Sequence, residues 1–163
     1  MKFHLIDRIV ELTRGERIVV VKAVSLAEEY LADHFPTFPV LPGVLMLEAM
    51  AEAAAWLVRD ATDFRPSVIL LRHAKNVTYK SFVKPGHLLT LSVTCRRIGP
   101  DDSDFDGVGH CEGEEVVRAR LGLRHLAPGR ADGTPTDSGE LDRRLADATR
   151  ARFALLLPSG SRH

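Results

Sequence analysis

Residues 33–52 read DHFPTFPVLPGVLMLEAMAE, and they join a proline-rich loop to an apolar segment that is rich in alanine. Pro36, Pro39 and Pro42 keep the loop extended, because a residue that precedes proline avoids helical dihedral angles. Beyond the loop, the alanines favour a helix, and leucine, valine and methionine make much of its surface apolar. We therefore predict one long helix over residues 43–59, largely buried in the fold.

Strand signals dominate the rest of the first 126 residues. Stretches such as residues 87–97 alternate apolar and polar side chains, which is typical of a half-buried strand. The predicted strands cover residues 2–12, 17–24, 67–75, 87–97, 105–112 and 116–126. Ser25 with Glu28 resembles a capping box and predicts a short helical turn, and residues 99–104 are expected to form a polar loop. One buried helix against several antiparallel strands predicts an α+β fold.

The chain has 163 residues, enough for one domain with a tail. Residues 127–140 are rich in glycine, proline, aspartate and threonine, so we predict a linker there. Residues 141–156 place leucine and alanine at helical spacing, which predicts a short amphipathic helix. The expected division is a folded domain over residues 1–126 and an appendage, a linker with a helical tail, over residues 127–163.

The composition argues against several classes of protein. The 22 basic residues balance 22 acidic residues, which argues against binding of nucleic acid through bulk positive charge. No apolar run approaches the roughly 20 residues of a membrane helix. Asp7 and Arg8 are charged and stand where a signal peptide would have its apolar stretch. Two cysteines are too few for a disulfide scaffold and fit a reducing compartment. We expect a cytoplasmic protein without a membrane span.

The neutral sum hides two adjacent blocks of opposite charge. Residues 64–100 hold seven basic residues and no acidic one, whereas residues 101–115 hold seven acidic residues and no lysine or arginine. Such blocks create a local field even though their charges cancel in the total. Two interpretations stay open, namely solvated strand faces and a docking patch for an acidic partner.

Three residues of the opening stretch have complementary chemistry. His34 titrates near neutral pH and is suited to general-base work. Glu48 lies among apolar neighbours, so we expect a partly buried carboxyl that serves as an acid. Gly43 leaves room for a substrate oxygen at the helix N-terminus, where free N–H groups point outward. Taken singly, a histidine is usually structural and a helix glutamate usually solvated. Together, a base, an acid and an oxyanion site are the parts needed for proton abstraction beside a thioester carbonyl.

This segment resembles the signature of the FabZ-type β-hydroxyacyl-acyl-carrier-protein dehydratases in the run HFPTFPVLPGVLMLEAMA, residues 34–51. A weaker resemblance extends over residues 3–126. It includes FHLIDR at residues 3–8 and the aromatic-basic pair Tyr79-Lys80 ahead of VKPG. The resemblance implies the hotdog fold, an antiparallel sheet wrapped around one long helix, which agrees with the α+β prediction.

The resemblance also implies a reaction, the dehydration of a (3R)-hydroxyacyl thioester on acyl carrier protein to the trans-2-enoyl product. By analogy, His34 removes the proton from C2, and Glu48 orients or protonates the departing hydroxyl. The N–H of Gly43 holds the thioester carbonyl, with Val44 as a second substrate-binding residue. The family takes the histidine and the glutamate of one site from different subunits, so a homodimer is implied at the minimum, or a trimer of dimers. Neither a metal nor an organic cofactor is implied.

Acyl carrier proteins are acidic, so the resemblance makes the basic block an expected docking surface. Its candidate residues are Lys80, Lys84, Arg96 and Arg97. The alternative, that these are solvated strand residues without a partner, stays open for each of them.

The departures of the chain from the family pattern include two positions in the motif segment. Thr37 stands where glycine is usual, and Glu52 stands where a glutamine commonly follows the catalytic acid. Helical spacing places Glu52 beside Glu48. The related isomerising dehydratases carry aspartate where Glu48 stands, so the glutamate favours plain dehydration.

Two other functions stay open. A hotdog thioesterase would activate water with a carboxylate and would not need the loop around His34, so that loop favours the dehydratase. A non-catalytic acyl-binding protein of the same fold would not need both His34 and Glu48. From a 3-hydroxyacyl thioester, a dehydratase forms a conjugated enoyl product, whereas a thioesterase releases a free thiol. The product therefore distinguishes the two enzymes.

Overall fold

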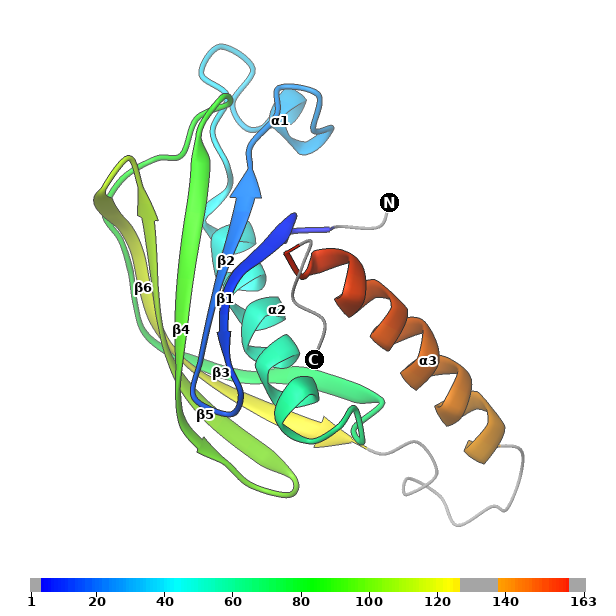
Figure 1. The fold of residues 1–163 in the computed structure, drawn as a ribbon. Coiled ribbons are helices and arrows are strands. Elements are labelled where there is room, and N and C mark those ends of the chain that lie inside the picture. Colours follow the sequence, from blue (N-terminus) through cyan, green and yellow to red (C-terminus); the bar gives the residue numbers. More distant parts are fainter. Residues whose placement is uncertain (1–3, 127–137, 159–163) are drawn as a thin grey trace.

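Six antiparallel strands form one sheet that curves around a central helix (Figure 1). The computed structural model describes residues 4–126 and 138–158. The strands are β1 (Arg8–Thr13), β2 (Arg17–Ala23), β3 (Val68–Tyr79), β4 (Leu88–Ile98), β5 (Asp102–Cys111) and β6 (Glu114–Leu126). The helices are α1 (Tyr30–Asp33), α2 (Gly43–Ala61) and α3 (Ser138–Leu156). This arrangement confirms the predicted α+β architecture of a sheet wrapped around one long helix.

The strand order across the sheet is β1-β2-β4-β5-β6-β3. Strand β3 follows α2 in sequence but lies at the far edge, where β6 is its one partner among the described strands. The two edges therefore belong to β1, which has six residues, and to β3, which has 12. An exposed edge presents unpaired backbone N–H and C=O groups.

Helix α2 packs closely on the concave face of the sheet. Ala53, Ala54 and Leu57 are fully buried there, as the apolar pattern predicted. Small residues let the helix and the sheet approach, because a side chain on Gly107 of β5 would overlap the sulfur of Met50. The observed helix ends at Ala61, two residues beyond the predicted end.

Several element boundaries differ from the sequence prediction. Strand β1 begins at Arg8 rather than within residues 4–7, and residues 2 and 3 of the predicted strand lie outside the described residues. Strand β5 begins at Asp102, inside the predicted polar loop, because its aspartates alternate with buried Ser103 and Phe105. The helical turn expected at Ser25 is displaced to α1, since the Ser25 hydroxyl accepts a hydrogen bond from the N–H of Ala27 and forms only a local turn.

Helix α3 lies on the side of α2 that the sheet leaves open (Figure 1). It begins three residues before the predicted tail helix and ends at the same residue. Most of the predicted linker, residues 127–137, lies outside the described residues. Within the described part of the chain, no helix is long and apolar enough to cross a membrane.

Candidate functional site

His34 follows α1 directly and lies in a closed loop over residues 34–40. The N–H of Val40 donates to the His34 carbonyl at 3.1 Å, and the N–H of Phe38 donates to the Phe35 carbonyl at 2.9 Å. The peptide bond between His34 and Phe35 is cis. The N–H of Leu41 donates to the carbonyl of Val83 at 2.8 Å, which attaches the loop to the segment after β3.

The imidazole of His34 is half-buried, and one of its nitrogens has a fixed partner. Nδ1 lies 3.2 Å from the carbonyl oxygen of Val40. A carbonyl oxygen only accepts hydrogen bonds, so Nδ1 carries the proton in the neutral ring. The lone pair is therefore on Nε2, and the loop supports the histidine in the tautomer that a general base requires.

The N-terminus of α2 begins within ten residues of His34. Pro42 occupies the N-cap, and no side chain caps the helix there. The N–H groups of Leu45 and Met46 donate to the Pro42 carbonyl, while those of Gly43 and Val44 precede the first hydrogen bonds of the helix. Free N–H groups at the positive end of a helix dipole are suited to hold an oxyanion.

Tyr79 forms one wall of this N-terminus and was absent from the predicted site. A side chain at Gly43 would come within 2.9 Å of Cε1 of the Tyr79 ring. Burial raises the pKa of the Tyr79 hydroxyl. The pair Tyr79-Lys80 was noted in the sequence, but its contact with the helix start depends on the sheet, which places the end of β3 beside α2.

Glu48 is exposed, which corrects the expectation of a partly buried carboxyl. It lies about 7.5 Å along the helix axis from Gly43. The face of α2 that carries Glu48 also carries Val44, whose exposed fraction is 69%. Neither the sheet nor α3 of the same chain covers this face. Among the described residues, no hydrogen bond or ion pair joins His34 to Glu48.

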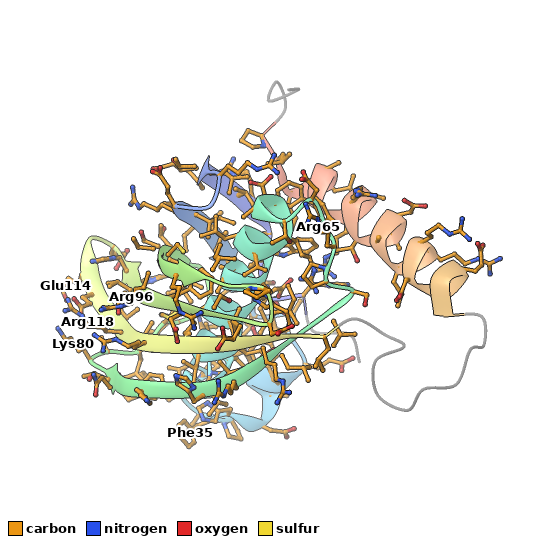
Figure 2. All side chains as sticks on the ribbon, turned by 90° about the horizontal axis from the view of Figure 1, so that it is seen from below. Phe35, Arg65, Lys80, Arg96, Glu114 and Arg118 are labelled. Atoms are coloured by element: carbon orange, nitrogen blue, oxygen red, sulfur yellow. The ribbon has the colours of Figure 1, made fainter. Side chains whose placement is uncertain are left out.

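The four docking candidates do not form one patch. The N–H of Cys95 donates to Glu16, and Gly15 lies beside Ala61 at the C-terminal end of α2. Arg96 and Arg97 therefore lie about a helix length, roughly 28 Å, from the His34 loop. Lys80 and Lys84 lie in the segment attached to that loop. Figure 2 shows the molecule from below, so Lys80 and Arg96 fall close together in that view although they belong to opposite ends of the sheet.

The two charge blocks pair with each other on the outer face of the sheet. Arg96 donates to Asp106 at 2.8 Å, and Arg97 donates to Asp102 and Asp104 at 2.8 and 3.0 Å. Burial by itself raises the pKa of Asp106, but hydrogen bonds from Arg96 and Arg120 outweigh it and hold the pKa below its ordinary value. Arg96 and Arg97 therefore fit the interpretation as solvated strand residues better than the interpretation as a docking patch, because aspartates on the adjacent strand pair with them.

Lys80 and Lys84 have different surroundings. Lys80 lies 2.8 Å from Glu115. Hydrogen bonds from Arg118 and from Lys80 lower the pKa of Glu115 to about 2. Lys84 makes no ion pair within residues 4–126 and 138–158, and its Nζ lies 5.0 Å from the centroid of the Phe38 ring. Of the four candidates, Lys84 is the cation with no acidic partner among the described residues.

A pocket of about 390 Å³ opens between the segment after β3 and the turn that joins β5 to β6. Its lining has mixed charge and consists of Ser81, Phe82, Lys84, His87, Cys111, Glu112, Glu114 and Val116. None of the candidate catalytic residues lines it. No group of three or more His, Cys, Asp or Glu side chains positioned for a metal ion is found among the described residues.

The sequence matches a family model and known proteins. A sequence model of the FabA-like domain matches residues 1–120. The 3-hydroxyacyl-[acyl-carrier-protein] dehydratase FabZ of Aromatoleum aromaticum is 37% identical over 122 residues, which cover 73% of this chain and 84% of the relative. The FabZ of Paracidovorax citrulli is 41% identical over 127 residues, which cover 72% and 87%. Helix α3 lies beyond the matched residues.

A solved structure supports the fold. The dehydratase heterocomplex ApeI:P from Xenorhabdus doucetiae contains a chain that matches with a TM-score of 0.63 at 17% identity. The match covers 77% of this chain and 84% of that chain. At this identity the likeness shows a shared hotdog fold.

Proposed function

The chain belongs to the family of FabZ-type 3-hydroxyacyl-[acyl-carrier-protein] dehydratases, and from this premise we propose that it is a lyase of acyl-chain synthesis. Its substrate is a (3R)-hydroxyacyl chain on acyl carrier protein, and its product is the trans-2-enoyl chain. The observation that carries the proposal is the His34 ring, whose Nδ1 is bound to the Val40 carbonyl beside an uncapped helix N-terminus.

The reaction assigns one step to each site residue. Nε2 of His34 takes the proton from C2, while the N–H groups of Gly43 and Val44 bind the thioester oxygen as negative charge develops on it. The electron pair of the broken C2–H bond forms the C2–C3 double bond, and the C3–O bond breaks. Glu48 gives its proton to the departing oxygen, which leaves as water. Proton exchange with solvent then returns His34 and Glu48 to their starting states.

The complete site takes Glu48 from a second copy of the chain. In a single chain, Glu48 and Val44 are exposed on an uncovered face of α2. That face continues through Tyr79 to β3, the long edge strand, where Leu70 is 50% and Leu71 is 38% exposed. Pairing of two β3 edges would cover these apolar residues and bring each Glu48 toward the partner's loop. We propose this homodimer as the minimal unit, which leaves a trimer of dimers open.

The carrier protein docks beside the His34 loop in this proposal. Phe35, Phe38 and Phe82 are exposed there, and the rings of Phe38 and Phe82 pack edge to face at 5.9 Å. Lys84 supplies a cation over this aromatic cluster, with Lys80 nearby in sequence. We exclude Arg96 and Arg97 from the docking surface, because their aspartate partners and their distance from the loop make them residues of the sheet.

Three expectations continue as parts of the proposal. Residues 1–126 form the dehydratase domain, the reaction needs no metal or organic cofactor, and the protein works in the cytoplasm. The free cysteines Cys95 and Cys111 fit a reducing compartment. The thioesterase alternative is disfavoured, since relatives of 37% and 41% identity are named as dehydratases.

The direct test incubates the protein with 3-hydroxyacyl chains of several lengths on acyl carrier protein. Conjugated enoyl product supports the proposal, and release of free thiol supports a thioesterase. We expect His34→Ala and Glu48→Gln each to lower kcat by about 100-fold or more. Equal and complete inactivity of the wild type and of His34→Ala on every chain length would remove the catalytic assignment.

Mixing the two inactive variants tests whether two chains share each site. A mixed dimer of His34→Ala and Glu48→Gln has one site with both defects and one site with neither. Random re-association after denaturation therefore restores about a quarter of the wild-type activity if sites are shared in this way. A site within one chain regains nothing on mixing, so absence of recovery in a mixture that contains hybrid dimers would contradict the shared site.

A further inference from the structure

Helix α3 is attached to α2 through a buried aromatic cluster. Phe153 is 8% exposed, and its ring centroid lies 5.6 Å from Trp56 of α2 and 5.4 Å from Phe64. Arg150 adds a hydrogen bond of 2.9 Å to the carbonyl of Asp63. The tail helix is therefore packed against the helix that carries Glu48, although it lies beyond the residues that the family model matches.

A single carboxylate joins α3 to two other segments. Oε1 of Glu52 accepts a hydrogen bond from Nη2 of Arg152 at 3.1 Å, and Oε2 accepts one from the N–H of Leu5 at 3.3 Å. The side chain of Glu52 is 20% exposed and that of Arg152 is 33% exposed. Both oxygens of Glu52 thus have defined partners, which fix its orientation on α2.

Glu52 needs a positively charged partner such as Arg152 because of its position on α2. Glu52 follows Glu48 by one helical turn, so the two carboxylates are neighbours on the surface of α2. Whenever Glu48 is without its catalytic proton, the two like charges at this spacing repel and weaken the helix. Glutamine, which is common at this position in the family, carries no charge. Arg152 supplies a hydrogen-bonded positive charge to Glu52, from a helix that the family pattern does not include. Arg59 of α2 adds a second positive charge near Glu52.

We propose that Arg152 is a positioning residue for the dehydration. Through Glu52 it compensates the charge beside Glu48 and holds the middle of α2 against the N-terminal segment, so that Glu48 keeps its orientation toward the site. The proposal rests on the dehydratase function. It assigns α3 to the catalytic unit rather than to a separate appendage.

The test combines Arg152→Met, Arg152→Lys, Glu52→Gln and the double variant Glu52→Gln/Arg152→Met. We expect Arg152→Met to lower kcat about tenfold with little change in KM, because a small displacement of a catalytic group affects the reacting geometry more than binding. Arg152→Lys keeps the charge and recovers most of the loss. In the Glu52→Gln background, the change at Arg152 has little effect on kcat.

The matched control is Arg144→Met. Arg144 lies on the same helix and pairs at 3.0 Å with Glu140, which also belongs to α3. Its removal takes away the same kind of side chain without touching α2, so kcat stays at the wild-type value. A loss of kcat in Arg152→Met that persists in the Glu52→Gln background would show a general packing role for α3 and overturn the proposal. Unchanged kcat, or a change in KM alone, would overturn it as well.

Amide hydrogen exchange gives a readout that does not depend on turnover. We expect Arg152→Met to accelerate exchange in the first half of α2 and at Leu5, and Arg144→Met to leave both at the wild-type rate. Wild-type protein without dehydratase activity would count against the proposed function, while the exchange experiment would still test the coupling. Equal exchange in Arg152→Met and the wild type would contradict the coupling whatever the activity.

Discussion

At the scale of single residues, Gly43 is constrained from two directions. In the proposed reaction its N–H group binds the substrate oxygen. Its α-carbon lies against the Tyr79 ring, where an added Cβ would come within 2.9 Å. The first requirement follows from the motif alone. The second depends on the contact with β3, which is distant in sequence, so the motif gives no sign of it.

We predict that Gly43→Ala destabilises the fold by about 1–3 kcal/mol, because the new methyl group overpacks against the ring. Thermal or urea unfolding measures the effect. Tyr79→Ala in the Gly43→Ala background is expected to remove the clash, so the second substitution costs less stability there than in the wild type. Additive costs of the two substitutions would show that the ring is not what excludes a side chain at position 43.

For the proposed catalytic pair, His34 and Glu48, the local sequence predicts the residues but not their burial. The motif predicts His34 and Glu48 as the catalytic residues, and the loop bond to Val40 gives His34 the tautomer that the proposed base requires. The burial of Glu48 was predicted wrongly, since an apolar helix surface does not reveal which of its faces the same chain covers. The sheet and α3 cover neighbouring faces of α2 and leave this one open.

At the scale of elements, the charge blocks are explained by strand register. Arg97 pairs with Asp104 across β4 and β5, and Arg120 of β6 faces Asp106 from the other side. Sequence alone marked the blocks but not their pairing, because a shift of one residue would turn these side chains to the opposite face of the sheet. The early start of β5 has the same cause, as its aspartates have cationic partners on adjacent strands.

The two sheet edges lead to a prediction about assembly. Leu70 on β3 is 50% exposed and Val10 on β1 is 48% exposed. If β3 is the subunit contact, Leu70→Glu dissociates the dimer and lowers activity about tenfold or more, because a charge on the contact edge opposes pairing. Val10→Glu is the matched control on the other edge and keeps both the dimer and the activity.

Light scattering coupled to size exclusion measures the oligomer, and enoyl formation measures the activity. Circular dichroism checks that both variants stay folded. A Leu70→Glu protein that remains a fully active dimer would exclude β3 as the contact. Dissociation of the Val10→Glu dimer would instead indicate that the two subunits contact each other through the β1 edge.

At the scale of the whole molecule, the end of the sheet opposite the His34 loop has a buried polar contact. Ser103 is 1% and His125 is 6% exposed, and Nε2 of His125 lies 2.9 Å from the Ser103 hydroxyl. This contact ties the start of β5 to the end of β6. Burial lowers the pKa of His125 below its ordinary value of 6.5. This effect outweighs a backbone hydrogen bond with Pro100 and the charges of Asp102 and Asp101, which raise the pKa.

This lowered pKa makes stability depend on pH. The unfolded chain binds the His125 proton more readily than the folded protein, so the stability from neutral His125 is complete above about pH 6.5. It is lost as the pH falls from there through the lowered pKa of the folded state. Asp102 and Asp106, whose pKa values lie below the ordinary 3.8, lose their contributions only at more acidic pH.

We therefore expect urea unfolding of the wild type to show a free energy of unfolding that falls as the pH drops below about 6.5, by at most roughly 1.4 kcal/mol per pH unit for one proton. His125→Gln keeps a polar group for Ser103 but does not titrate. It should be less stable than the wild type near pH 7.5 and should show a shallower decline over the same interval. Parallel pH profiles for the two proteins would assign the decline to other groups and contradict a neutral buried His125.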